Sequence, residues 1–504
     1  MDYFMGIDLG TSTVKVIVMD EVARTLTLQS KSYPTRHPFP GHAEQDPGDW
    51  WEATASCIRQ AMAEDFLEGK GIRSIGLSGQ MHGLVLLDKE MKPIRNAIIW
   101  PDRRSTALCR QRSESSRMAG FRQMTGLPLA TGFLAPSLEW VRENEPTIYG
   151  KASCFMLPKD YIRFRLTGLI ATDPTDASGT YLFDLGTGSW AGGLFEEFGL
   201  STSLAPEIME TMSMAGSVSQ SASAATGLRA GTPVIVGGSD QSMAALALGA
   251  SRPGVIAAAI STGGTLITTV RAPLHDPRLH TLRHVYPDSW LMMGATLSAA
   301  AALAWFNERI LGKPDGNDRW MPGSAVEELS VLAGSIPAGS ESLVFLPYLS
   351  GERTPHMNAN AKGCFIGLTT AHSRAHMARA IMEGVAFALC DSLDIFRELG
   401  LPADEILCCG GGAKSEVWRQ ILCDVFDEGI AWEKSSEQSA IGAALAGAEV
   451  LGLRLRSGGG GGSPEEKSLP RPENRDLYRS RKGTFRKIYV QLGGIFEELS
   501  EFRP

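Results

Sequence analysis

An acidic, hydroxyl-rich turn separates two apolar runs near the start of the chain, within residues 4–18. Asp8 ends the first run, where a carboxylate can hold Mg²⁺ directly or through water, and Gly10 permits a tight turn with exposed backbone N–H groups. The further groups that could bind phosphate are the side chains of Thr11, Ser12, Thr13 and Lys15. We interpret the segment as a phosphate-binding hairpin; the alternative is an ordinary hairpin in which Asp and Gly only make the turn.

A second carboxylate, Asp240, follows the run 233–236 and two glycines, and it precedes an alanine-rich helical pattern over 243–249. A helix N-terminus favours an ionised carboxylate, and such a carboxylate can accept a proton from a substrate hydroxyl. The alternative is that Asp240 only caps the helix.

Phosphoryl transfer from ATP would use both carboxylates, because it needs Mg²⁺ on the phosphates, donors along the triphosphate and a base for the acceptor hydroxyl. In this interpretation Asp8 holds Mg²⁺ and Asp240 is the base. A second glycine- and hydroxyl-rich turn, with Thr262 and Thr265, would bind phosphate beside the first hairpin. The three glycines at 410–412 follow an apolar run and would admit adenosine.

The acceptor would be a polyol, and two segments could form its pocket. Residues 78–83 combine the amide of Gln80, the thioether of Met81 and the imidazole of His82. Trp100 offers an apolar plate for a sugar face, with the carboxylate of Asp102 close by in the sequence. The alternatives are a hydrogen-bonded core histidine for His82 and simple core packing for Trp100.

Apolar runs of strand type alternate with helical patterns, which predicts an α/β fold. We expect strands over 72–78, 84–87 and 234–237, and helices over 50–63 and 377–389. The pattern resets at Ser251–Gly254, and residues 255–270 repeat the strand, turn and strand of the N-terminus. We therefore predict two related halves that flank a catalytic cleft, with domains over 1–250 and 251–452. Residues 453–504 would form a glycine linker, centred on Ser457–Ser463, and a peripheral C-terminal helix.

Composition excludes several other functions. At 504 residues the chain is long enough for two to four domains at roughly 150 residues each. A net charge of -8 with scattered Lys and Arg argues against nucleic acid or a membrane surface as partner. The first residues lack a signal-peptide pattern, and the eight cysteines have no Cys-x-x-Cys spacing. These features favour a cytoplasmic protein with free thiols and a small-molecule partner.

Taken in order, these motifs resemble the FGGY carbohydrate kinases. The resemblance rests on residues 6–12, 42–51, 78–83, 237–240, 346–356, 362–368, 410–415 and 438–444. It implies two ribonuclease H-like domains of the actin and hexokinase type, which transfer the γ-phosphoryl group of ATP to a sugar hydroxyl. Within the family the match is closest to kinases that act on the ketopentose D-xylulose.

The resemblance also implies roles for individual residues. Asp240 matches the catalytic base, Asp8 the carboxylate needed for Mg-ATP, and Met81 with His82 the pair that contacts the sugar. The second sugar segment contains Trp100 and Asp102, the adenosine motif contains Gly411, Gly412 and Lys414, and the second phosphate hairpin contains Thr262 and Thr265.

Two departures from the family pattern leave more than one acceptor substrate possible. The kinases of D-xylulose commonly have Trp-Asn-Asp-Gly-Arg where this chain has Trp100-Pro101-Asp102-Arg103-Arg104, and they have Asn where this chain has Gln241. Another ketose, a polyol or a sugar acid is therefore an alternative substrate, and a catalytically silent sugar sensor is an alternative function. A homodimer is also left open.

Overall fold

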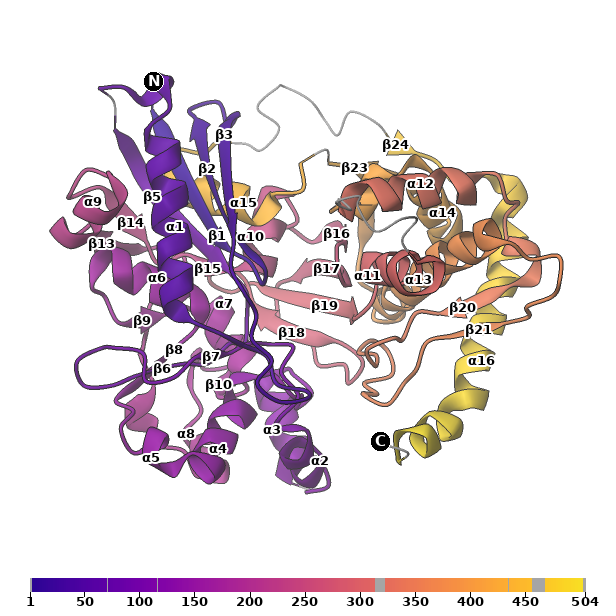
Figure 1. Ribbon diagram of the computed structural model, residues 1–504, viewed down its shortest axis with the longest axis horizontal. Helices are drawn as coiled ribbons and strands as arrows, with labels where there is room; N and C mark the ends of the chain where they lie inside the picture. The colour runs from indigo at the N-terminus through magenta and orange to yellow at the C-terminus, as the bar shows by residue number, and fades with distance from the viewer. Residues whose placement is uncertain are drawn as a thin grey trace. The chain divides into compact units, whose positions relative to one another are not determined.

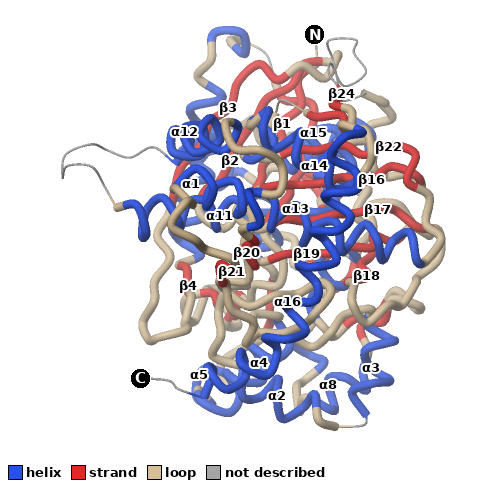
Figure 2. The backbone as a smooth tube through the Cα atoms, turned by 90° about the vertical axis from the view of Figure 1, so that its right-hand side faces the viewer, coloured by secondary structure: helices blue, strands red, loops and turns tan. Residues whose placement is uncertain are grey.

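The computed structural model describes residues 2–69, 71–115, 117–312, 322–433, 435–455 and 467–501 (Figures 1 and 2). The chain divides into two compact units. Unit one comprises residues 1–251, 270–291 and 437–462, and unit two comprises residues 252–269, 292–436 and 463–504. The predicted glycine linker at 457–463 lies outside the described residues, and the predicted domain boundaries stay a prediction.

The central sheet of unit one has the strand order β13-β14-β5-β1-β2-β3, and β15 also pairs with β5. Its strands are β1 (Tyr3–Leu9), β2 (Thr13–Asp20), β3 (Thr25–Ser32), β5 (Ile72–Gly79), β13 (Met214–Ser217), β14 (Pro233–Ile235) and β15 (Gly238–Ser239). β1 is antiparallel to β2 and parallel to β5. This confirms the predicted N-terminal hairpin and the predicted strand at 72–78.

The sheet of unit two repeats this arrangement. β16 (Gly254–Ile260) is antiparallel to β17 (Gly264–Val270) and parallel to β22 (Ala403–Cys409). Neighbouring strands in this sheet follow the order β19-β17-β16-β22-β23-β24. The further strands are β19 (Trp290–Thr296), β23 (Ile430–Trp432) and β24 (Lys467–Ser468). The predicted repeat of strand, turn and strand is therefore confirmed.

Shorter strands pair outside the two central sheets. They are β4 (Glu44–Gln45) with β7 (Ala97–Ile98), β6 (Val85–Leu87) with β8 (Cys154–Met156), β9 (Ala171–Thr172) with β12 (Glu207–Ile208), β10 (Phe183–Asp184) with β11 (Ser189–Trp190), and β20 (Val344–Leu346) with β21 (Cys364–Ile366). β18 (His280–Arg283) is not one of these pairs, because it lies next to β19 in the strand order.

Helices pack on both sheets. In unit one they are α1 (Pro47–Met62), α2 (Thr106–Ser113), α3 (Arg117–Thr125), α4 (Leu134–Asn144), α5 (Pro146–Tyr149), α6 (Pro158–Thr167), α7 (Pro174–Ala177), α8 (Gly192–Glu197), α9 (Gln220–Thr226), α10 (Asp240–Ala247) and α15 (Gln438–Val450). In unit two they are α11 (Ala300–Trp305), α12 (Pro322–Gly334), α13 (Arg374–Glu398), α14 (Glu416–Phe426) and α16 (Arg475–Glu501). α13 packs against both α14 and α16 (Figure 2).

The side chains of β1 alternate between two helical layers, as the period of a strand requires. Met5, Ile7 and Leu9 share one core with residues of α1, which lies in front of the sheet in Figure 1. Phe4 packs on the other face against alanines of α15.

Glycine is needed where α15 meets this second face. A Cβ added at Gly6 would lie 2.0 Å from the Ala440 carbonyl oxygen, and one at Gly76 would lie 1.7 Å from that of Ala443. The motif residues 438–444 therefore form a helix that packs directly on the backbone of β1 and β5, the strands that carry the candidate site.

Within the described residues, no helix is both long and apolar enough to cross a membrane. All eight cysteines carry free thiols.

Candidate active site

Asp8 and Asp240 lie on either side of the same strand end. In the sheet Asp8 is the register partner of Ser78 of β5, and Gly238 of β15 is the partner of Ser78 on the other side. β15 ends at Ser239, and Asp240 begins α10 directly after it. Parallel pairing thus brings together two carboxylates that are 232 positions apart in the sequence.

Burial raises the pKa values of both carboxyls toward neutral pH. Burial raises the pKa of Asp240 to about 7, and the charge of Asp8 adds to the increase. Burial likewise raises the pKa of Asp8 to about 6, although the charge of Lys15 and the Ser78 hydroxyl oppose it. Two acids that titrate between pH 6 and 7 can each hold or release a proton at neutral pH.

Asp8 meets the requirement for a metal ligand. Its Oδ1 is buried and has no hydrogen-bond partner among the described residues. A buried carboxylate oxygen without a partner is costly unless a cation or donor completes it. A hard oxygen donor of this kind suits Mg²⁺, which binds proteins through one or two carboxylates.

Helix capping does not account for Asp240. The N-cap of α10 is Ser239, and Asp240 is the first helical residue. Asp240 Oδ1 accepts a hydrogen bond from the backbone N–H of Gln241 at 2.7 Å. The carboxylate therefore lies at the start of the helix, where the dipole stabilises its ionised form.

The N-terminal hairpin is fixed by side chains from other segments. Trp100 Nε1 donates to Thr11 Oγ1 at 2.8 Å, and Gln45 Nε2 donates to the Thr11 carbonyl at 2.6 Å. The hydroxyl of Tyr33 donates to the Gly10 carbonyl. Trp100, predicted to contact sugar, is thus attached to the predicted phosphate turn.

Lys15 lies opposite Asp8 in the hairpin, and Gln241 directly follows Asp240 in the chain. Lys15 is the register partner of Asp8, and its Nζ lies 2.5 Å from Glu437 Oε2. A phosphate at Lys15 would compete with this carboxylate. Ser12 and Thr13 lie at the turn and at the start of β2.

Gln80 lies beneath the site with 1% of its surface exposed. Its backbone N–H donates to the Leu9 carbonyl at 2.8 Å, and its Nε2 donates to Gln45 Oε1 at 3.1 Å. The same Oε1 accepts from Trp50 Nε1 at 3.0 Å. Gln45 therefore connects the hairpin, α1 and the segment that was predicted to bind sugar.

Met81 and His82 follow at the same strand end and are largely buried. His82 has a φ of 71°, its ring stacks on Phe133 with centroids 4.3 Å apart, and its Nδ1 donates to the Gly179 carbonyl at 2.6 Å. A Cβ at Gly179 would lie 3.0 Å from Met81 Cε and 3.1 Å from His82 Nδ1, so glycine lets the chain approach both side chains. The ring orientation of His82 is consequently fixed.

Asp102 is enclosed by protein donors. Its Oδ2 accepts from the Ala43 N–H at 2.6 Å and pairs with Arg104 Nη2 at 2.8 Å, while its Oδ1 accepts from Arg104 Nε at 2.9 Å. Arg104 also pairs with Glu44 at 2.7 Å. Asp102 is 1% exposed, and this geometry holds the segment after Trp100 in place.

In unit two, the second turn and the three glycines lie at neighbouring strand ends. β16 runs parallel to β22 with Ala259 opposite Cys409, so Thr262 and Gly410 both follow paired ends. Gly410 has a φ of 94°, and a Cβ at Gly412 would lie 2.4 Å from Ile260 Cγ2. A Cβ at Gly411 would meet nothing within 4 Å. This open backbone can admit a flat ring.

The other predicted nucleotide residues belong to the same two segments. Thr262 is exposed, and its carbonyl accepts from the Ala299 N–H at 2.9 Å. Thr265 is the second residue of β17, and Lys414 is exposed just before α14.

No pattern in the sequence assigns a role to Gln45 or Tyr33, although both contact the hairpin. Gln45 lies in the segment 42–51 that carries the resemblance, but nothing local indicates that its amide reaches Thr11. Tyr33 follows β3, and no motif marks it.

Two α/β units that each present a glycine- and hydroxyl-rich hairpin, one with a pair of carboxylates, define a two-domain kinase fold. Models for the "FGGY family of carbohydrate kinases" match this chain: the N-terminal domain over residues 3–247 and the C-terminal domain over residues 257–449. The chain belongs to the FGGY family of carbohydrate kinases. The predicted family and two-domain α/β fold are confirmed.

Individual relatives agree with this assignment. The xylulose kinase of Bacillus subtilis (strain 168) is 33% identical over 515 residues, which cover 100% of both chains. The crystal structure of a xyloylose kinase from Brucella ovis has a TM-score of 0.87 at 31% identity and covers 98% of this chain and 100% of that chain. A gluconate kinase from Lactobacillus acidophilus has a TM-score of 0.90 at 26% identity, with 99% of each chain covered.

Proposed function

We propose that the protein is an ATP- and Mg²⁺-dependent xylulose kinase that converts D-xylulose to D-xylulose 5-phosphate. The observation that carries the proposal is the pair Asp8 and Asp240 at one strand end, in a chain that matches xylulose kinases over its full length. The small-molecule partners are therefore the sugar and ATP. We place the reaction in the cytoplasm, where eight free thiols would stay reduced.

Asp240 acts as the general base. Its carboxylate accepts the proton of the attacking sugar hydroxyl, and a pKa of about 7 lets it do so at neutral pH and later release the proton. Its carboxylate position is fixed by the Gln241 N–H at 2.7 Å. Such a base typically contributes about 10² to 10⁴ in rate.

Asp8 would hold Mg²⁺ through its Oδ1, which has no hydrogen-bond partner among the described residues. When bound there, Mg²⁺ would supply positive charge to neutralise the transferring phosphoryl group. The turn residues Thr11, Ser12 and Thr13 and the side chain of Lys15 would donate to phosphate oxygens.

The sugar and the nucleotide are bound by different parts of the chain. Met81, His82, Trp100 and Gln241 would contact the sugar, while Gln80 and Asp102 support the segments that carry them. Adenosine would lie on Gly411 and Gly412, with Lys414 and the turn at Thr262 and Thr265 donating to the nucleotide.

A sugar acid is the second candidate acceptor. Arg103 is exposed where kinases of D-xylulose commonly have glycine, and a guanidinium favours a carboxylate. A gluconate kinase is also among the structures with a high TM-score.

The test combines a substrate panel with one substitution. ADP release is measured with D-xylulose, L-ribulose, D-ribulose, glycerol, erythritol and gluconate, and D-xylulose should give the highest kcat/KM. Asp240→Asn should lower kcat about 10²-fold or more, because the base is lost while the shape is kept. Asp65→Asn, at an exposed carboxylate, is the matched control and should leave kcat unchanged.

Three results would contradict the proposal. If gluconate gives the highest kcat/KM, the acceptor is a sugar acid and not D-xylulose. Turnover of Asp240→Asn near that of the parent would exclude Asp240 as base. ATP binding without turnover of any sugar would favour a silent sensor.

A further inference from the structure

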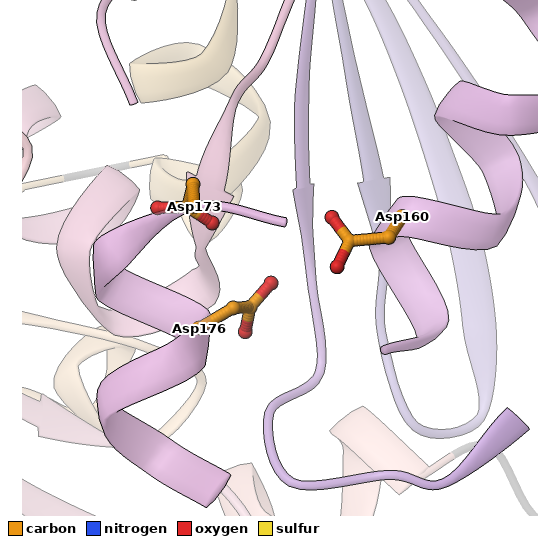
Figure 3. A group of neighbouring side chains, drawn as sticks. All are labelled: Asp160, Asp173 and Asp176. Carbon is orange, nitrogen blue, oxygen red and sulfur yellow. The ribbon is translucent and has the colours of Figure 1, made fainter. Parts of the chain in front are cut away.

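A cluster of five charged side chains is buried in unit one beneath the loop that leads to Asp240. It consists of Lys159, Asp160, Arg163, Asp173 and Asp176, each 0% exposed. The three aspartates offer oxygens within 4.8 Å of one another, and Figure 3 shows their carboxylates facing a common space. We call this set the charge cluster.

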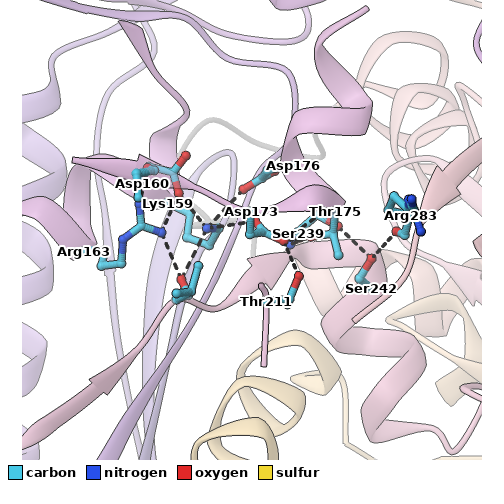
Figure 4. Close-up of polar contacts among 12 residues, drawn as sticks. Lys159, Asp160, Arg163, Asp173, Thr175, Asp176, Thr211, Ser239, Ser242 and Arg283 are labelled. Atoms are coloured by element: carbon cyan, nitrogen blue, oxygen red, sulfur yellow. Dashed lines mark hydrogen bonds and ion pairs between the residues drawn. The ribbon is translucent and has the colours of Figure 1, made fainter. Parts of the chain in front are cut away.

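A lysine ammonium fills the space that the carboxylates share. Lys159 Nζ lies 2.7 Å from Asp160, 3.2 Å from Asp173 and 3.5 Å from Asp176 (Figure 4). Arg163 Nη1 adds a second pair with Asp160 at 2.8 Å. An internal cation therefore replaces the metal that three carboxylates could otherwise hold.

Burying five charges costs several kcal/mol per ion before pairing, and apolar residues would often be as stable. The contacts of the charge cluster therefore indicate a role beyond stability. Its two cations both reach the backbone just before Asp240: Arg163 Nη1 donates to the Val236 carbonyl at 3.1 Å and Lys159 Nζ at 3.5 Å.

A second chain of hydrogen bonds reaches the residue next to Asp240. Asp173 Oδ2 accepts from Thr175 Oγ1 at 2.6 Å, and that same Oγ1 accepts from the Ser239 N–H at 2.8 Å. Thr211 Oγ1 also donates to Asp173 Oδ2 at 2.7 Å (Figure 4). The charge cluster therefore holds both ends of the segment 236–239.

The segment between these two attachments is also sterically confined. Gly237 has a φ of 76°, and a Cβ there would lie 2.4 Å from the Leu77 carbonyl oxygen. A Cβ at Gly238 would lie 3.0 Å from Thr175 Oγ1. Both glycines are confined and both flanking residues are hydrogen-bonded, so the position of the start of α10 is restricted.

We propose that Thr175 is a positioning residue for the reaction: its hydroxyl transmits the fixed geometry of Asp173 and Lys159 to the Ser239 N–H and thereby sets where Asp240 lies. The inference rests on the proposed function, in which Asp240 is the base. Thr175 touches no reacting atom in this scheme. Its effect is on the rate of the chemical step, since misplacing a catalytic group by about 1 Å can cost about 10²-fold.

The experiment removes the Thr175 hydroxyl and keeps the shape. Thr175→Val should lower kcat about 10- to 100-fold and change the KM for D-xylulose less than about 3-fold. Thr175→Ser retains the hydroxyl and should restore kcat to within about 3-fold of the parent. Thr175→Ala is the substitute if the valine variant does not fold.

A buried threonine elsewhere in unit one supplies the matched control. Thr226 is 0% exposed, its Oγ1 donates to the Ala222 carbonyl at 2.7 Å, and it accepts from the Leu228 N–H at 3.3 Å. Thr226→Val therefore loses comparable hydrogen bonds away from Asp240, and it should keep the parental kcat.

A double substitution separates positioning from a general structural effect. If Thr175 acts through Asp240, Asp240→Asn combined with Thr175→Val should be no more than about 3-fold slower than Asp240→Asn alone. A full additional loss in the double variant overturns the inference, and so does a kcat for Thr175→Val equal to that of Thr226→Val. A parental kcat for Asp240→Asn is a different failure, because it removes the proposed base itself.

Discussion

The raised pKa values of Asp8 and Asp240 have one physical origin at the scale of single residues: two carboxyls share a poorly solvated strand end. The charge of Asp8 raises the pKa of Asp240, and burial contributes more. Of the two, Asp8 has the lower value, about 6 against about 7. Asp8 is thus the first to ionise, which suits a metal ligand, while Asp240 retains a proton to higher pH.

Neutralising Asp8 should lower the pKa of Asp240. In Asp8→Asn the repulsion is gone and only burial remains, so more of Asp240 is ionised at pH 6 than in the parent. The measurement is an NMR titration of ¹³C-carboxyl-labelled aspartate, with the Asp240 signal assigned from Asp240→Asn. Asp65→Asn should leave this signal in place. An Asp240 pKa that rises or stays in Asp8→Asn would show that the two charges do not interact.

The same pKa values determine how stability changes with pH. The ordinary pKa of an aspartate carboxyl is 3.8, whereas burial raises that of Asp240 to about 7 in the folded chain, so the folded state binds more protons between these values. The contribution of Asp240 to the free energy of unfolding is fully present below pH 4 and is lost as the pH rises through 7. Asp240→Asn should therefore show a smaller fall in unfolding free energy between pH 5 and pH 8, measured by urea denaturation. An unchanged slope would contradict the raised pKa.

At the scale of elements, the sequence predicts what is local and repeated. The strand, turn and strand of residues 4–18 and its repeat at 255–270 are both confirmed, because alternating apolar residues and glycine turns act over short distances. The helix at Glu416–Phe426 begins where Ser415 accepts from the Trp418 N–H, a cap that depends only on neighbouring residues.

Contacts between distant segments are not encoded locally. The predicted strand at 234–237 ends at Ile235, because Val236 instead accepts from Arg163 and Gly237 turns the chain. The sequence predicts Asp102 as a sugar ligand from its neighbour Trp100, whereas its oxygens pair with Arg104 and accept a hydrogen bond from the Ala43 N–H. Its role toward sugar, like the other site assignments, stays a prediction.

Gly411 offers a test of the nucleotide-binding loop between β22 and α14. Its φ is -62° and a Cβ would meet nothing within 4 Å, so Gly411→Ala should fold as the parent does. If adenosine lies against this backbone, the added methyl should raise the KM for ATP about 10-fold while kcat/KM for D-xylulose at saturating ATP stays within about 3-fold.

The matched control for Gly411→Ala is Gly493→Ala in α16. A Cβ there also meets nothing within 4 Å, and alanine favours the helix. It should leave the KM for ATP unchanged. Equal KM values for ATP in both variants would place the adenosine away from Gly411.

At the scale of the whole molecule, the two units divide the predicted ligands between them. The carboxylate pair and the residues assigned to sugar belong to unit one, whereas Thr262, Thr265 and the glycines at 410–412 belong to unit two. The two hairpins share one architecture. Asp8 lies near the end of β1 in the hairpin of unit one, and Ile260 ends β16 in the hairpin of unit two.

This division predicts which amides each ligand protects from hydrogen exchange. ADP without Mg²⁺ or sugar should slow exchange in residues 261–265 and 410–415, because a bound ligand stabilises the segments that hold it. D-xylulose alone should slow exchange in residues 78–83 and 237–241. The measurement is hydrogen exchange followed by mass spectrometry, with the α9 region as an internal control expected to stay unchanged. Protection of 78–83 by ADP but not by D-xylulose would reverse the assignment, since the segment with Met81 and His82 would then bind the nucleotide.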